Sequence, residues 1–240
     1  MKRIGIIAAM PGELKPLVRG WRHERRNGVD LWRWRYDEGE WLAACAGAGM
    51  DAAARAFAAA ESAGPLSFAV STGWAGALTG ECPAGQAFWA SGVINAKTGE
   101  RHRVAHWSGE RWLVTSPIVA NEAEKHRLAA TYGAALVDME AAAVARLAEL
   151  RGIPCYCLKG VSDAVDDKLP DFNRFLAPGG QMRLGALIFF ALLRPALWPR
   201  LVRMGENSRR AARGIAESLL DFLDERAYIR TRNGYPNRKP

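Results

Sequence analysis

The chain has 240 residues, 49% of them hydrophobic and 24% charged, which is the composition of an ordinary globular protein with a sizeable core. Its formal net charge is +8. The basic residues gather towards the two ends, beside apolar residues and without a nucleic-acid-binding motif, so we expect no nucleic-acid partner. The longest apolar run, 184–193, is roughly half the length that spans a bilayer. We also expect no signal peptide.

The hydrophobic periodicity predicts strands that alternate with helices along most of the chain. In chain order we expect a strand at 4–10, a short helix at 11–19, a hairpin of strands at 29–36 and 40–45, a helix at 51–62, a strand at 66–71 followed by a glycine-containing turn at 72–76, strands at 85–93 and 111–114, a helix at 121–132, a strand at 135–138, a helix at 139–151 and a strand at 155–161. Such alternation is typical of an α/β protein with helices on both faces of a mostly parallel sheet, and the hairpin makes the sheet mixed. We therefore predict a three-layer α/β/α fold in a single domain, 1–226.

The C-terminal part, 183–226, differs from the rest of the chain. Residues 183–204 mix Leu, Phe and Trp with prolines and arginines, and 206–226 is predicted to be a helix. Apolar residues recur every four positions along one stripe of that helix, at Ala211, Ile215, Leu219 and Leu223. We expect the polar tail, 227–240, to be flexible.

The cysteines give no sign of a metal site. Cys45, Cys82, Cys155 and Cys157 form no Cys-x-x-Cys pair, and no histidine is placed to complete a zinc site with them. Reduced, buried thiols of a cytoplasmic protein explain all four. We expect no metal and no cofactor.

Three carboxylates, Glu13, Glu140 and Asp163, each follow the end of a predicted strand. Ligands of open α/β sheets bind at the carboxyl ends of strands, so these side chains are candidates for a shared crevice. Each also has a structural explanation of its own. Glu13 would interact favourably with the helix dipole in a first helical turn, Glu140 would be an exposed residue at the start of a helix, and Asp163 would cap the next helix.

Four segments carry a more specific combination. They are Met-Lys-Arg-Ile-Gly-Ile-Ile-Ala-Ala-Met followed by Glu13, then Thr-Gly-Trp-Ala-Gly at 72–76, Val-Asp-Met-Glu-Ala-Ala-Ala at 137–143 and Val-Ser-Asp at 161–163. In order and spacing, from Met1 to about Leu176, the chain resembles the superfamily of purine nucleoside phosphorylases and methylthioadenosine/S-adenosylhomocysteine nucleosidases. The resemblance implies a nucleoside phosphorylase-like fold, an enzyme that cleaves N-glycosidic bonds, and a homo-oligomer.

The same resemblance implies a role for each motif residue. Asp163, with Ser162 beside it, would protonate or hydrogen-bond the purine N7, so that the base leaves neutral. Glu140 would accept hydrogen bonds from ribose hydroxyls and favour a cationic sugar transition state, and Met139 would pack against the sugar. Glu13 would position or deprotonate the attacking water, as in the nucleosidase branch.

Two departures from the superfamily's pattern concern this pocket. Trp74 follows Gly73 in the glycine loop, where many relatives have a small serine that helps to hold phosphate or the nucleophilic water. Phosphate and water therefore both stay open as the second substrate. The stretch 115–119, which ends at Val119, stands where nucleosidases have a purine-stacking Phe, so we expect aliphatic contact with the base.

The segment 184–204 allows two interpretations. Its apolar residues, interleaved with Arg194, Arg200 and Arg203, suit a peripheral membrane contact, but they also suit a core helix with a subunit contact. The Arg-Pro-Ala-Leu-Trp-Pro-Arg stretch at 194–200 also resembles the hopanoid-associated phosphorylase branch. That branch acts on adenosylhopane, a nucleoside attached to a large apolar lipid.

We therefore expect an adenine nucleoside to be cleaved by phosphate or by water. The substrate is either lipid-linked, as adenosylhopane is, or a small molecule of the methylthioadenosine or S-adenosylhomocysteine type. A non-catalytic nucleoside-binding protein that kept the fold is the alternative from another class. We expect a cytoplasmic protein, peripheral to the inner face of the membrane if 184–204 contacts lipid.

Overall fold

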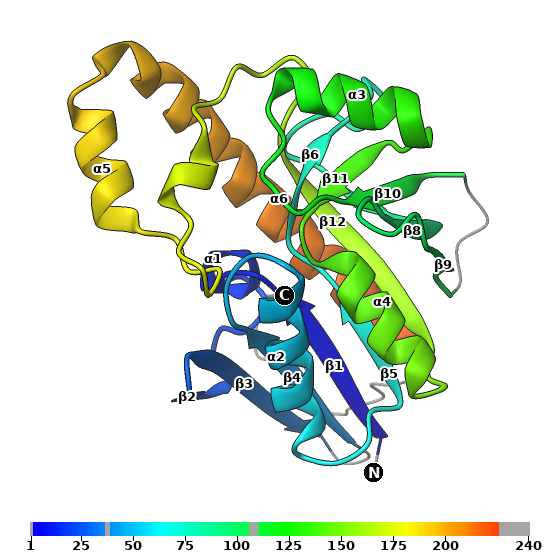
Figure 1. Ribbon diagram of the computed structural model, residues 1–240. Coiled ribbons are helices and arrows are strands. Elements are labelled where there is room, and N and C mark those ends of the chain that lie inside the picture. The colour runs from blue at the N-terminus through cyan, green and yellow to red at the C-terminus, as the bar shows by residue number, and fades with distance from the viewer. Residues whose placement is uncertain (1, 37–38, 106–109, 226–240) are drawn as a thin grey trace.

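The computed structural model describes residues 2–36, 39–105 and 110–225 (Figure 1). Its strands are β1 (Lys2–Ala8), β2 (Arg22–Arg26), β3 (Val29–Tyr36), β4 (Gly39–Cys45), β5 (Phe68–Ser71), β6 (Trp74–Ala77), β7 (Ala87–Trp89), β8 (Gly92–Asn95), β9 (Arg101–Arg103), β10 (Trp112–Thr115), β11 (Leu136–Asp138) and β12 (Cys155–Asp163). Its helices are α1 (Pro11–Leu14), α2 (Met50–Glu61), α3 (Glu122–Tyr132), α4 (Ala141–Leu150), α5 (Leu184–Leu192) and α6 (Trp198–Glu225), with short 3-10 helices η1 (Phe172–Phe175) and η2 (Pro195–Leu197).

The strands form one mixed sheet, in the order β2-β3-β4-β1-β5-β12-β6-β11-β10-β8-β9, with β7 paired to β12 off this path. Two parallel groups make up its centre, β4-β1-β5-β12-β6 and β11-β10-β8. They run in opposite directions, because β6 and β11 are antiparallel. The predicted α/β fold with a mixed, mostly parallel sheet is confirmed, and so is the hairpin of β3 and β4.

The meeting of the two groups at β6 brings two strand ends together. Gly76 of β6 pairs with Val137 of β11 on one side and with Asp163 of β12 on the other. The carboxyl ends of β11 and β12 therefore approach the same point of β6 from opposite directions. A sequence pattern predicts that each strand ends in a carboxylate, but it does not predict this convergence.

Helices cover both faces of the sheet (Figure 1). On one face, α2 and α4 pack small alanine side chains and Phe57 against the strands. On the other face lies α6, whose predicted stripe of Ala211, Ile215, Leu219 and Leu223 is fully buried, as expected. Leu128 of α3 belongs to a separate buried cluster that includes Val114 of β10. The neighbouring Leu113 belongs to the cluster of α4, so α3 and α4 cover opposite faces of this part of the sheet.

Three predicted boundaries within the sheet region are wrong. The helix expected at 11–19 ends at Leu14, because Pro16 cannot continue it. The turn expected at 72–76 contains the start of strand β6, which the sheet needs between β12 and β11. The strand expected at 85–93 is two strands, β7 and β8, with different partners.

Two further elements escape sequence patterns for identifiable reasons. Strand β2 is Arg-His-Glu-Arg-Arg and fully exposed, so no apolar alternation marks it, and its backbone pairing with β3 defines it. Helix α6 begins at Trp198, eight residues before the predicted start, because Pro199 lies in its first turn, where no N–H is required. The tail expected at 227–240 lies outside the described residues.

The segment after η1 leaves the sheet. In Figure 1, α5 stands apart from the sheet on one side of the molecule, and the chain returns along α6. Within the described residues no single helix is long and apolar enough to cross a membrane. The pair Leu184–Leu192 and Pro195–Leu223 would qualify by length and composition together, but it is bent by 109°.

Candidate active site

One cavity, of about 310 Å³, lies where the ends of β11 and β12 converge. Seven of the eight residues singled out from the sequence line it: Glu13, Trp74, Val119, Met139, Glu140, Ser162 and Asp163. The eighth, Gly73, lies directly behind the Glu13 carboxylate. The structure thus brings together side chains that are up to 150 positions apart in the sequence.

Glu13 is held by backbone donors. Its Oε2 accepts hydrogen bonds from the N–H groups of Ala9 (2.7 Å) and Met10 (2.8 Å), and its Oε1 accepts one from the N–H of Trp74 (2.8 Å). Burial raises the pKa of this carboxyl above its ordinary value, although these hydrogen bonds and the positive charge of Lys159 oppose the shift. A carboxyl group with a raised pKa is suited to exchanging a proton with a bound water.

Glu140 directly precedes α4. Its Oε1 accepts a hydrogen bond from the N–H of Gly49 (2.7 Å), and its Oε2 accepts a longer one from the N–H of Met139 (3.3 Å). Burial, and after it the negative charge of Asp138, raises the pKa of Glu140 to about 8. The charge of this residue therefore changes near neutral pH.

A buried ion pair lies beneath Glu140. Lys159 Nζ is 2.9 Å from Asp138 Oδ2 and donates to the carbonyl of Thr72 (2.8 Å). Asp138 also accepts a hydrogen bond from Thr115 Oγ1 (2.7 Å). Burial is the largest single influence on Lys159 and would lower its pKa, but the negative charges around it, first that of Asp138 and then others including Glu140, together raise the pKa. The pair anchors the end of β11 to β12, and with it the turn that presents Glu140.

Asp163 ends β12 between two side-chain donors. Ser162 Oγ donates to Asp163 Oδ1 (2.5 Å). Lys125 of α3, which is almost completely buried, donates to Asp163 Oδ2 and to the carbonyl of Ala164 (2.5 Å). A carboxylate and an ammonium group therefore stand side by side in the cavity wall. The backbone of Gly76 makes room for both, since a Cβ there would lie 3.2 Å from Asp163 Oδ2.

Gly73 and Trp74 shape the wall around Glu13. Gly73 has a φ of +115°, and a Cβ at this position would lie 2.8 Å from Glu13 Oε1. The indole Nε1 of Trp74 donates to the carbonyl of Ser208 in α6 (3.0 Å), which fixes the ring at the cavity. The large ring that replaces the small serine of many relatives therefore lines the cavity.

The stretch after β10 lines the cavity with aliphatic side chains, as expected. Val119 donates its N–H to Asn173 Oδ1 (2.8 Å), and its carbonyl accepts from Asn173 Nδ2 (3.0 Å), so this stretch is fastened to η1. An aromatic side chain also lines the cavity, however: Phe172 of η1. The aliphatic contact expected with the base stays a prediction, and Phe172 adds an aromatic side chain from a different part of the chain.

Sequence reasoning missed Lys125, Lys159 and Phe172. Lys125 lies in a strongly charged helix, so nothing in the local sequence distinguishes it from a solvated lysine. Lys159 did carry a signal, because it is the one charged residue between Cys155 and Val161, and a charge in a buried strand requires a partner.

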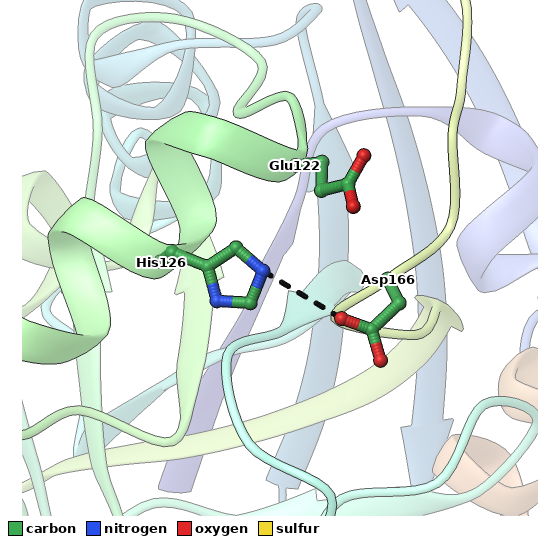
Figure 2. Close-up of side chains that lie close together, drawn as sticks. All are labelled: Glu122, His126 and Asp166. Atoms are coloured by element: carbon green, nitrogen blue, oxygen red, sulfur yellow. Dashed lines mark ion pairs between the residues drawn. The ribbon is translucent and has the colours of Figure 1, made fainter.

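One group in the described residues has the composition of a metal site (Figure 2). Glu122 and His126 stand one turn apart on α3, Asp166 follows β12, and their ligand atoms lie within 4.8 Å of one another. His126 Nε2 is 3.6 Å from Asp166 Oδ1, and both side chains are exposed. None of the three lines the cavity. An exposed ion pair explains the contact, and the expectation of a protein without a metal stays a prediction.

The fold and the site define an α/β protein with a carboxylate-lined small-molecule cavity at its strand ends. The sequence model of the Phosphorylase superfamily matches residues 3–104 and 96–189, and the chain belongs to this superfamily. No protein of curated function matches the chain significantly in sequence.

Solved structures share the fold at low sequence identity. Futalosine hydrolase of Helicobacter pylori superposes with a TM-score of 0.70 at 16% identity, over 93% of this chain and 98% of that chain. A mutant of the Helicobacter pylori nucleosidase MTAN, with 5′-methylthioadenosine in its active site, superposes with a TM-score of 0.70 at 16% identity, over 94% of this chain and 99% of that chain. The 5′-methylthioadenosine nucleosidase of Arabidopsis thaliana superposes with a TM-score of 0.70 at 19% identity, over 93% of this chain and 96% of that chain.

Proposed function

We propose that the protein cleaves the N-glycosidic bond of an adenine nucleoside, with water as the nucleophile. The proposal rests on one observation: three buried carboxylates, Glu13, Glu140 and Asp163, line the same cavity. Glycosidic cleavage needs a proton or hydrogen bond at the leaving group, negative charge near the sugar cation, and a base for the nucleophile. Three separately held carboxylates meet these needs. The superfamily's solved structures that bind 5′-methylthioadenosine support the substrate class.

Each carboxylate has one task in the proposed reaction. The bond between ribose C1′ and the purine nitrogen breaks, and its electron pair goes to the base. In its protonated form Asp163, oriented by Lys125 and Ser162, donates a hydrogen bond or its proton to N7, so that the base leaves neutral and Asp163 is left as the carboxylate. Glu140 accepts hydrogen bonds from the ribose hydroxyls and stabilises the positive sugar, with Met139 packed against it. Glu13 takes a proton from the water whose oxygen attacks C1′.

The charges of the cavity favour water over phosphate. Among the described residues that line it, Lys125 is the one cation, and Asp163 and the carbonyl of Ala164 already occupy its ammonium group. A phosphate dianion close to Glu13 would meet repulsion without a compensating cation. A neutral water molecule meets none. Trp74 also stands where relatives have a small serine.

The cavity also favours an apolar group on the nucleoside. One wall is apolar and comes from the segment after β12 and from α6: Leu169, Phe172, Leu176, Met182, Leu184, Leu187 and Met204. A lipid-linked nucleoside such as adenosylhopane is the substrate we propose first, because this wall continues to the exposed surface at Leu184. The methylthioadenosine type is the second candidate, since its small 5′ group is apolar too. We propose a cytoplasmic location, in agreement with the four free, buried cysteines.

A substrate panel tests the reaction. The protein is incubated with adenosylhopane, methylthioadenosine, S-adenosylhomocysteine and inosine, each with and without phosphate, and the released base and sugar are identified. We expect adenine with free ribose derivative, at a rate that phosphate does not change. Ribose 1-phosphate would contradict the choice of water. Rapid adenine release from the small nucleosides alone would contradict the lipid-linked substrate.

The variant Asp163→Asn tests the assignment of the leaving-group residue. We expect kcat/KM to fall by about 10²–10⁴-fold, because the amide cannot donate a proton to N7 in the same way. Asp166→Asn is the matched control, since Asp166 is an exposed carboxylate outside the cavity. Equal activity of Asp163→Asn and wild type would overturn the mechanism. Tight nucleoside binding without any cleavage by wild type would favour a non-catalytic binding protein.

A further inference from the structure

Among the residues that the structure describes, most of the exposed large apolar side chains lie in one short segment. We call α5, η2 and the first turns of α6 up to Val202 the apolar arm. Its exposed side chains are Leu184, Ile188, Phe189, Leu192, Leu193, Trp198 and Val202, each between 49% and 65% exposed. Helix α5 contains no buried residue at all. An apolar surface of this kind on a folded protein marks an interaction site.

The charge of the arm has one sign. The arm itself has two arginines, Arg194 and Arg200, and no acidic residue, and Arg183 directly precedes it. The neighbouring Arg174 and Arg203 are paired with Asp171 and Asp167. The guanidinium of Arg194 stacks on the ring of Phe190 at 3.9 Å, so positive charge lies directly against the apolar surface. Arg183 and Arg200 are also exposed. Apolar side chains bordered by arginine and tryptophan are typical of helices that lie in the interface of an anionic membrane.

The shape of the arm suits a surface contact rather than a span. Helix α5 has nine residues, which corresponds to about 14 Å, less than half the hydrocarbon thickness of a bilayer. It meets the following helix at 109°. Trp198 Nε1 donates to the carbonyl of Ala191 (2.8 Å), which fastens the bend.

The arm is continuous with the cavity. Leu184 and Leu187 of α5 and Met204 of α6 line the cavity, and Leu184 is also exposed. A surface bound to the exposed side of the arm would therefore lie beside the apolar wall of the site.

We propose that the apolar arm docks onto the surface of an anionic lipid bilayer and holds the apolar wall of the cavity beside it. A second copy of the chain fits less well, because a two-fold contact through the arm would place its arginines against those of the partner. The inference goes beyond the proposed function and does not depend on it, since lipid binding is measured without any nucleoside.

Vesicle flotation with the full chain tests the docking. One set of vesicles consists of phosphatidylcholine, and in a second set phosphatidylglycerol replaces a third of it. We expect the protein to float with the anionic vesicles, to bind the neutral ones at least about tenfold more weakly, and to lose binding as salt is added. Equal binding to both sets, or none to either, would overturn the proposal.

Two sets of variants locate the contact. In Phe189→Asp/Leu193→Asp, charges enter two side chains one turn apart on the arm, neither of which lines the cavity. We expect anionic-vesicle binding to fall at least tenfold, with an unchanged thermal unfolding midpoint. Leu150→Asp is the matched control, because Leu150 is an equally exposed apolar residue at the end of α4, outside the arm, and should leave binding unchanged.

The second set, Arg183→Gln and Arg200→Gln, keeps the apolar surface and lowers the charge. Each substitution should weaken binding to anionic vesicles roughly fivefold and leave binding to neutral vesicles unaffected. Sedimentation of the wild type and of Phe189→Asp/Leu193→Asp completes the test. If wild type is an oligomer that does not bind vesicles, and the double variant is a monomer, the arm is a subunit contact and the proposal is wrong. Unchanged vesicle binding by the double variant would also refute it.

Discussion

The three carboxylates to which we assign roles in the reaction have different surroundings. Glu13 accepts three backbone hydrogen bonds, Glu140 accepts backbone hydrogen bonds near a buried ion pair, and Asp163 is paired with a lysine. Backbone donors keep a carboxylate in place without neutralising it, whereas Lys125 brings a full positive charge to Asp163. Three similar side chains thus acquire different chemistry from their surroundings.

The variant Lys125→Met should distinguish a role of Lys125 in orienting Asp163 from a role in binding the substrate. Without the ammonium group, Asp163 loses the donor that orients it, so we expect kcat to fall by on the order of 10²-fold with KM little changed. Steady-state kinetics on the cleaved nucleoside measures both. Lys97→Met, at an exposed position, is the control. A rise in KM with unchanged kcat would show that Lys125 binds substrate directly and does not act through Asp163.

Replacing Gly73 by Ala should damage the site beyond its effect on the backbone. The new Cβ would sit 2.8 Å from Glu13 Oε1, in a backbone conformation with φ at +115°. Gly99→Ala is a matched control, because its φ is also positive and nothing lies within 4 Å of the added Cβ. We expect each variant to lose about 1–3 kcal/mol of unfolding free energy. Only Gly73→Ala should also lose activity, by at least tenfold, as measured by adenine release.

Among the elements, β12 does the most to assemble the site. It pairs with β5, β6 and β7, ends in Asp163, and carries Lys159 beneath Glu140. The ion pair of Lys159 with Asp138 of β11 links the two oppositely directed halves of the sheet across β6. Both side chains are completely buried, so each charge depends on the other.

Replacing Lys159 by Met should therefore leave the Asp138 carboxylate buried without its cation. We expect a loss of about 3–5 kcal/mol of unfolding free energy, measured by urea denaturation. The double variant Lys159→Met/Asp138→Asn removes both charges and should recover much of that loss. If the two single variants and the double variant showed additive losses, the ion pair would not be the source of the effect.

For the whole molecule, the buried carboxyl groups predict how stability depends on pH. The folded-state pKa of Glu140 is about 8, above the ordinary value of 4.5, and burial raises that of Glu13 as well. A raised pKa means that the folded state favours the protonated form. The stabilisation from protonation is therefore complete below the unfolded pKa and is lost as the pH rises through the folded pKa, near 8 for Glu140.

The variant Glu140→Gln should lack the part of the pH dependence of stability that comes from Glu140. Above pH 8, wild type should lose on the order of a few kcal/mol of unfolding free energy relative to mildly acidic pH, and the variant should lose clearly less. Urea denaturation at pH values on either side of 8 measures both. The variant should lose nucleosidase activity at every pH, because the ribose hydroxyls lose their carboxylate acceptor. Parallel pH curves for the two proteins would contradict the raised pKa of Glu140.

The sequence by itself determined the local features. Periodicity located α2, α3, α4 and most strands within a few residues, and the stripe of α6 from Ala211 to Leu223 is buried as predicted. The sequence also indicated Glu13, Glu140 and Asp163, which line one cavity, because a carboxylate after a buried strand is visible in the order of residues. These features depend on neighbours in the chain, so a local pattern suffices to find them.

Only the tertiary structure decided how these pieces meet. The convergence of β11 and β12 on Gly76 depends on the antiparallel pairing of β6 and β11, which joins residues about 60 positions apart. The partnership of Lys125 with Asp163 and the exposure of the apolar arm likewise depend on which distant surfaces pack together. Burial and charge pairing are properties of that packing. The sequence therefore indicated the three carboxylates, and the fold supplied their partners, the raised pKa values of Glu13 and Glu140, and the cavity that all three line.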